Sequence, residues 1–150
     1  MREDPAAFLD DMVDLVAGFG GEDGLDTAET EAYIALRRAE ARASSARRML
    51  AMDLDNDGAV SGAELAVTQR AASARQRGTL QRLFEAADRD QDGIIAASEI
   101  RLAARVAGLR ALSDPAAAAL RATRAFDSDG DGRITMAEVR AAVASLDDAT

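Results

Sequence analysis

Carboxylates stand at regular spacing in three short segments of this chain. The segments cover residues 53–64, 88–99 and 127–138, and each has Asp at its positions 1, 3 and 5, Gly at position 6 and Glu at position 12. Four carboxylates this close together repel one another unless a cation lies between them. A hard divalent cation of the size of Ca²⁺ takes about six to eight oxygen ligands, so this residue set suits its chemistry.

Each segment supplies its expected ligands from four side chains and one backbone carbonyl group. The carbonyl belongs to position 7, the glycine at position 6 permits the tight turn before it, and a water molecule completes the set. The predicted ligands are Asp53, Asp55, Asp57, Ala59, Glu64, Asp88, Asp90, Asp92, Ile94, Glu99, Asp127, Asp129, Asp131, Arg133 and Glu138. The middle segment has Ala96 at position 9, where Ser61 and Thr135 carry a hydroxyl that steadies the water. We therefore expect three Ca²⁺ ions, with the middle one bound more weakly.

The composition excludes several other kinds of site. The chain of 150 residues has no Cys and no His, and all 18 of its basic residues are Arg. Thiolate sites, histidine bases, Schiff-base lysines and P-loops are therefore absent. The acidic loops account for every dense carboxylate cluster, so no enzyme is predicted. The arginine and alanine usage suggests a GC-rich, bacterial genome.

The net charge of −9 originates in the metal loops. They hold 12 of the 27 acidic residues, which leaves 15 acids against 18 arginines in the rest of the chain. The densest basic group, Arg37, Arg38, Arg42, Arg47 and Arg48, is interpreted as a solvated helical face, so no nucleic acid partner is predicted. No apolar stretch is long enough to span a membrane, and the acidic start lacks the apolar core of a signal peptide, so a cytoplasmic location is expected.

The twelve-residue pattern D-x-[DN]-x-[DN]-G-x5-E resembles the calcium loop of the EF-hand family. The resemblance implies an all-α fold of helix–loop–helix units, paired through short β-bridges at position 8 of each loop. Val60, Ile95 and Ile134 occupy that position. Intervals of 35 and 39 residues between the loops leave room for one exiting and one entering helix.

A degenerate fourth hand is predicted upstream of the three complete loops. Residues 19–29 align with residues 126–138 if the loop is two residues shorter, so that Phe19, Leu25 and Glu29 match Phe126, Ile134 and Glu138. The loop lacks the first two aspartates, so we expect it to keep its pairing strand without binding metal. Apolar residues upstream, namely Phe8, Met12, Leu15, Val16 and Phe19, indicate its entering helix.

The whole chain then resembles a four-hand protein of the calmodulin-like or bacterial calerythrin-like type. The expected domains are residues 1–77, with hands at about 8–38 and 42–77, and residues 78–150, with hands at about 79–108 and 114–147. Gly78-Thr79 is predicted to separate two helices, Gly108 to end one, and Ser113-Asp114-Pro115 to begin another. Residues 27–52 lack Gly and Pro, so they form either one long helix or two helices that meet at Ser44-Ser45.

The resemblance implies a monomeric Ca²⁺ buffer or a Ca²⁺ sensor that binds a target helix. Sensor grooves are rich in Met and Phe. Met12, Met49, Met52 and Met136 are scattered here, which favours a buffer or a sensor with one dedicated partner. One alternative is a lanthanide-binding protein, although position 2 holds Leu54, Arg89 and Ser128 where lanthanide-selective relatives carry Pro. A second alternative is an extracytoplasmic module that calcium stabilises.

Overall fold

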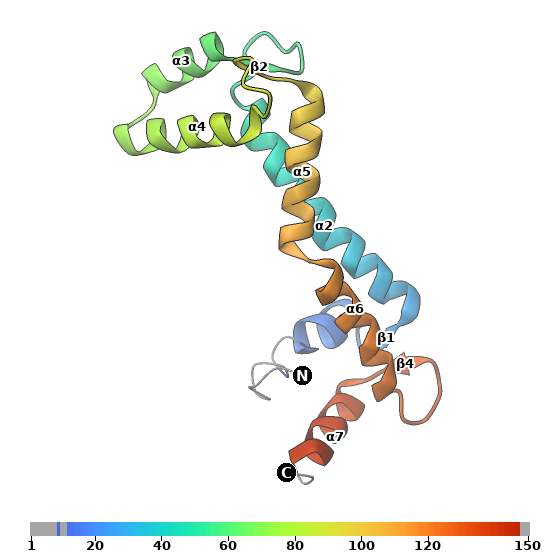
Figure 1. The fold of residues 1–150 in the computed structure, drawn as a ribbon. Coiled ribbons are helices and arrows are strands. Elements are labelled where there is room, and N and C mark those ends of the chain that lie inside the picture. Colours follow the sequence, from blue (N-terminus) through green and yellow to red (C-terminus); the bar gives the residue numbers. More distant parts are fainter. Residues whose placement is uncertain (1–8, 10–11, 148–150) are drawn as a thin grey trace. The chain divides into compact units, whose positions relative to one another are not determined.

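The computed structural model describes residue 9 and residues 12–147, and these are mostly helical (Figure 1). Two-residue strands lie in the loops between helices, which confirms the predicted all-α fold with short β-bridges. The elements in chain order are η1 (Val13–Ala17), β1 (Leu25–Asp26), α2 (Thr27–Leu50), β2 (Val60–Ser61), α3 (Gly62–Ala71), α4 (Ala74–Ala87), β3 (Ile94–Ile95), α5 (Ala97–Ala111), α6 (Asp114–Ala122), η2 (Thr123–Phe126), β4 (Arg133–Ile134) and α7 (Met136–Asp147). No helix among these residues has the length and apolar character that crossing a bilayer requires.

The strands pair in an order that differs from the expected one. β2 pairs with β3, with Val60 opposite Ile95, whereas β1 pairs with β4, with Leu25 opposite Ile134. The first acidic loop therefore pairs with the second, and the third pairs with residues 25–26. The prediction of pairs between neighbouring hands was wrong, although the four position-8 residues do meet as two antiparallel bridges.

The continuous helix α2 explains this pairing. Its 24 residues run from β1 to the first acidic loop without a break at Ser44-Ser45. A continuous helix offers no turn at which the chain could reverse between β1 and the first acidic loop. α3 and α4, by contrast, are joined by a two-residue link at Ala72-Ser73. The chain can reverse at that link and bring β2 against β3.

Two compact units follow from the pairing. One consists of residues 37–111, and the other combines residues 1–36 with residues 112–150. The expected division after residue 77 was therefore wrong. We call them the central unit (37–111) and the terminal unit (1–36 and 112–150).

Each unit has its own apolar core beside its β-bridge. The core of the central unit consists of Met49, Met52, Val60, Leu65, Phe84, Ala87, Ile95 and Ile100. The core of the terminal unit consists of Met12, Leu15, Val16, Leu25, Ile134 and Val139. The predicted apolar face of the first entering segment is thus confirmed at Met12, Leu15 and Val16, while Phe8 lies outside the described residues. Phe19 packs edge-on against Tyr33, with 5.6 Å between the ring centroids.

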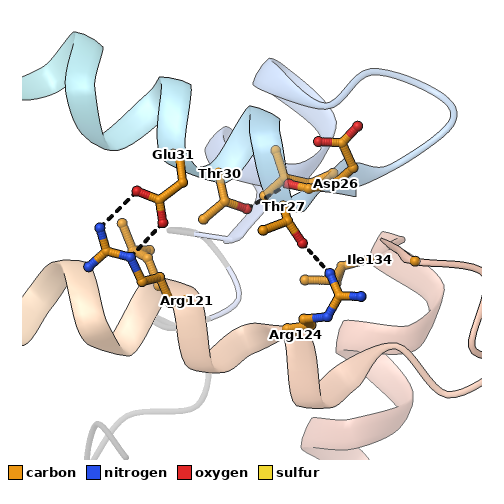
Figure 2. Close-up of a pocket in the computed structure, with 10 residues that line it drawn as sticks. Asp26, Thr27, Thr30, Glu31, Arg121, Arg124 and Ile134 are labelled. Atoms are coloured by element: carbon orange, nitrogen blue, oxygen red, sulfur yellow. Dashed lines mark hydrogen bonds and ion pairs between the residues drawn. The ribbon is translucent and has the colours of Figure 1, made fainter.

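Contacts between α2 and the segment α6–η2 support the pairing in the terminal unit (Figure 2). Arg121 donates two hydrogen bonds to the Glu31 carboxylate, at 2.5 and 2.8 Å, and Arg124 donates one to the Thr27 hydroxyl. Both arginines are largely solvated. Exposed ion pairs contribute about 0–1 kcal/mol, so the apolar core supplies most of the stability of this pairing. The cavity beside them measures about 40 Å³, enough for little more than a water molecule.

Serines mark three of the helix starts, and Ser61 at the start of α3 forms a capping box with Glu64. The Ser113 hydroxyl accepts from the N–H of Ala116 at 3.2 Å, and Pro115 lies in the first turn of α6, which confirms the predicted start. α4 begins earlier than expected, at Ala74, because Ser73 and Gln76 form a reciprocal capping box. The Ser-x-x-Gln spacing was the available signal for this start. Gly78 therefore lies inside α4, so the prediction of a helix boundary there was wrong.

Gly108 also lies inside a helix, because α5 continues to Ala111. A Cβ atom added at Gly108 would lie 3.1 Å from the Arg38 carbonyl oxygen and 3.1 Å from the Arg42 Cγ atom. This glycine therefore allows α5 to approach α2 closely within the central unit, and it does not end the helix.

Replacement of Gly78 by Ala is expected to stabilise the protein. A Cβ atom there meets only the mobile end of Arg82, at 3.5 Å, and alanine is favoured over glycine in a helix by about 0.5–1 kcal/mol. Denaturant unfolding should show a gain of that size. Gly108→Ala is the matched control, because its Cβ atom would press on the α2 backbone, and it should gain less or lose stability. An equal gain at both positions would contradict this interpretation of Gly108.

Candidate metal centres

The structure brings three of the four predicted carboxylates together in each loop, and Glu64, Asp92 and Glu138 lie outside these groups. Oxygen atoms of Asp53, Asp55 and Asp57 lie within 4.8 Å of one another, and those of Asp127, Asp129 and Asp131 do the same. In the middle loop the corresponding group comprises Asp88, Asp90 and Glu99. Carboxylate oxygens at this separation are close enough to share one cation.

Backbone N–H groups hold the aspartates in place. The position-1 carboxylate accepts from the glycine N–H at position 6, at 3.0 Å in Asp53, 3.1 Å in Asp88 and 3.1 Å in Asp127. The position-3 carboxylate accepts from position 5, and the position-5 carboxylate accepts from position 7. This is how Asp92 is held, by the N–H of Ile94 at 2.8 Å. Each loop therefore curls around its carboxylates through local hydrogen bonds.

Two positions in each loop have left-handed backbone geometry. Position 6 is Gly58, Gly93 or Gly132, with φ between 85° and 89°, as the sequence pattern predicts. Position 4 is Asn56, Gln91 or Gly130, with φ of 62°, 61° and 76°. The requirement at position 4 was missed in the sequence. Asn56 and Gly130 could have indicated this backbone conformation, because Asn and Gly adopt positive φ readily. Gln91 gives no such indication.

The position-12 glutamates lie on the first turn of the exiting helices. Each accepts from the N–H of position 2 (Leu54, Arg89 or Ser128) and from the N–H of position 9, at 2.7–2.9 Å. Ser61 and Thr135 also donate their hydroxyls to Glu64 and Glu138, both at 2.9 Å. Ala96 has no hydroxyl to donate to Glu99.

These hydrogen bonds keep the glutamates ionised. The N–H groups of Ser61 and Leu54 lower the pKa of Glu64 to about 2. Those of Thr135 and Ser128 lower the pKa of Glu138 to about 2. The pKa of Glu99 is also lowered, first by the N–H of Arg89. Near neutral pH the glutamates therefore carry the charge that a cation requires.

Two carboxylate oxygens in these loops are buried without a hydrogen-bond donor. They are Oδ1 of Asp53 and Oδ1 of Asp88, both at position 1. A buried carboxylate oxygen without a partner is costly. A cation held between the carboxylates would satisfy this oxygen in each loop, so the residues present fit a hard divalent ion such as Ca²⁺.

The predicted fourth hand has a different arrangement. Asp26 and Glu29 form a reciprocal capping box, in which each side chain accepts from the backbone N–H of the other residue at 2.8 Å. This places Glu29 in the position-12 register. Carboxylate groups that could hold a metal ion occur in the three complete loops of the described residues, and residues 19–29 contribute to none of them.

Comparisons with known proteins agree with these three loops. The sequence model of the family described as EF hand matches residues 48–67, 80–102 and 124–144. Neither the curated proteins nor the solved structures contain a match. Each matched segment includes one acidic loop and the flanking turns of its helices. The family matches, the carboxylate groups and the paired β-bridges together support the placement of this chain in the EF-hand superfamily.

Proposed function

We propose that this protein binds three Ca²⁺ ions and acts as a calcium buffer or a calcium sensor rather than as an enzyme. The ligands in each loop are the carboxylates at positions 1, 3, 5 and 12 and the backbone carbonyl at position 7. The observation that carries the proposal is a buried carboxylate oxygen without a donor at Asp53 and at Asp88, two residues that are each grouped with two further carboxylates. Bound Ca²⁺ would supply two positive charges at each of these points.

Binding has a simple electrostatic consequence. The chain carries a net charge of −9, and three Ca²⁺ ions would reduce it to −3. A bound ion would offset the mutual repulsion of the loop carboxylates. Ala96 lacks the position-9 hydroxyl that is bonded to glutamate in the other two loops. We therefore propose that the middle site is the weakest of the three.

A buffer role is supported by the methionines. Met12, Met49 and Met52 are at most 2% exposed and belong to the two cores. They are therefore not available to line an adaptable target groove of the kind that promiscuous sensors use.

A sensor role is supported by a groove of about 750 Å³ in the central unit. Small and aliphatic side chains of α5, including Leu102, Ala103 and Val106, line it beside α2 and α4. Arg48, Arg89 and Arg110 also line it, against one acidic residue, Glu99. Such a surface suits a helix with one apolar and one acidic face. A dye that fluoresces on apolar surfaces separates the two roles, because calcium should raise its signal for a sensor and leave it unchanged for a buffer.

Calorimetric titration of metal-free protein with Ca²⁺, in about 1 mM Mg²⁺, tests the proposal directly. Three sites tighter than about 10⁻⁵ M are expected for an intracellular buffer or sensor. Sites that fill only near 10⁻³ M would support an extracytoplasmic protein that calcium stabilises. La³⁺ that displaces Ca²⁺ at nanomolar concentration would support the lanthanide alternative. Heat changes without saturation would contradict all three.

A further inference from the structure

The side chain of Arg133 lies in the loop of the degenerate first hand. Its Nε atom donates to the Asp23 carbonyl oxygen at 2.7 Å, and Nη2 donates to the Gly24 carbonyl oxygen at 2.7 Å. Nη2 also donates to Glu29 Oε2 at 3.0 Å, and Nη1 lies 3.4 Å from Asp26 Oδ2. One guanidinium group thus contacts two carbonyl oxygens and two carboxylates.

Two of the groups that accept hydrogen bonds from this guanidinium occupy loop positions that are assigned to metal ligands in the complete hands. The bridge between Leu25 and Ile134 places Leu25 at position 8, so Gly24 is at position 7 and Glu29 is at position 12. In the complete hands, the position-7 carbonyl and the position-12 glutamate are the groups assigned to Ca²⁺. The first hand therefore offers the same two kinds of oxygen to an arginine.

The backbone geometry at Gly24 favours the contact with Arg133. Gly24 has φ of +82°, and a Cβ atom there would lie 2.7 Å from the Ile134 carbonyl oxygen. Because residue 24 is glycine, its backbone can lie close to β4, whose first residue is Arg133. A planar guanidinium with five N–H donors can meet several oxygens at once, which a lysine ammonium does less well. The position-7 residues of the other loops, Ala59 and Ile94, cannot provide a cation.

We propose that the first hand takes the guanidinium of Arg133, from its paired hand, as its cation in place of Ca²⁺. The side chain of Arg133 is 30% exposed, and those of Asp26 and Glu29 are 37% and 35% exposed. Arg121 and Glu31, paired in the same unit, are 49% and 48% exposed. The Arg133 contacts are thus more shielded from water than the Arg121–Glu31 pair.

Hydrogen exchange of the Asp26 and Glu29 amides in Arg133→Met tests the structural part of this proposal. Both amides donate within the capping box that Arg133 contacts, so loss of the guanidinium should weaken the hydrogen bonds that protect them from exchange. We expect exchange at these amides to be at least about tenfold faster, while circular dichroism confirms that the variant is folded. Arg121→Met is the matched control and should leave both amides unchanged. Unchanged exchange in Arg133→Met, or equal acceleration in Arg121→Met, would overturn the proposal.

Calcium stoichiometry tests the exclusion of metal from this hand. Glu29→Gln should bind as many Ca²⁺ ions as the unaltered protein, because Glu29 holds an arginine. Glu138→Gln, at the equivalent position of the paired hand, should bind one fewer. If Glu29→Gln also loses one ion, the first hand binds metal and the proposal is wrong. If neither variant loses an ion, the ligand assignment of the fourth hand fails, and the exchange experiment still decides the role of Arg133.

Discussion

Removal of calcium should lower the midpoint of thermal unfolding by about 30 °C. A ligand present at 1,000 times its dissociation constant stabilises the folded state by about 4 kcal/mol per site, and three such sites add about 12 kcal/mol. This is comparable with the whole stability of an ordinary domain, about 5–15 kcal/mol. For a chain of this size, 1 kcal/mol corresponds to about 2–4 °C. The carboxylates within 4.8 Å of one another also repel when the ion is absent.

Circular dichroism in 1 mM CaCl₂ and in excess chelator measures this shift. NaCl at matched ionic strength is the control, because simple screening would relieve part of the repulsion without occupying a site. If the unfolding midpoint changes with ionic strength alone, the loops are acidic turns and not specific metal sites. A midpoint that falls only with the chelator would support specific binding.

Replacement of Glu138 by Gln should remove one Ca²⁺ ion per chain. The change removes one charge and replaces one carboxylate oxygen by an NH2 group, which cannot bind a cation, so a single carbonyl oxygen remains as a possible ligand. We expect the affinity of this site to fall by at least about 100-fold, which corresponds to about 2.7 kcal/mol. Glu64→Gln should do the same in the first complete loop. Calorimetric stoichiometry or equilibrium dialysis gives the count.

The chain itself indicates that Gln preserves the helix start at these positions. Gln76 already forms a capping box with Ser73 at the start of α4, as Glu64 does with Ser61 at the start of α3. Loss of calcium in Glu138→Gln would therefore reflect the ligand and not an unfolded helix. Glu85→Gln, in an exposed contact with Gln81 on α4, is the control and should keep every ion. An unchanged count in Glu138→Gln would remove Glu138 from the ligand set.

The acidic loops could be predicted from the sequence because their geometry is local. Each loop is held by hydrogen bonds between residues at most ten positions apart, from the Asp53 carboxylate to the Gly58 N–H or from Glu64 to the Leu54 N–H. Residue types and spacing therefore determine the carboxylate positions. The same holds for the start of α6 at Ser113. The start of α4 is also set by a local feature, the Ser73 capping box. The prediction relied on the glycine at position 78 and therefore placed the helix boundary there.

Only the tertiary structure decided which loops pair and where the Arg133 side chain lies. Leu25 with Ile134 and Arg133 with Gly24 are contacts across more than 100 residues, and Val60 pairs with Ile95 across 35 residues. All four position-8 residues are aliphatic, so their side chains are compatible with any pairing. The uninterrupted helix α2 leaves no turn between β1 and the first acidic loop, and the apolar residues around β1 and β4 form one core. The sequence by itself therefore determined three acidic loops, whereas the packing of segments distant in the sequence determined how these loops and the N-terminal segment are combined.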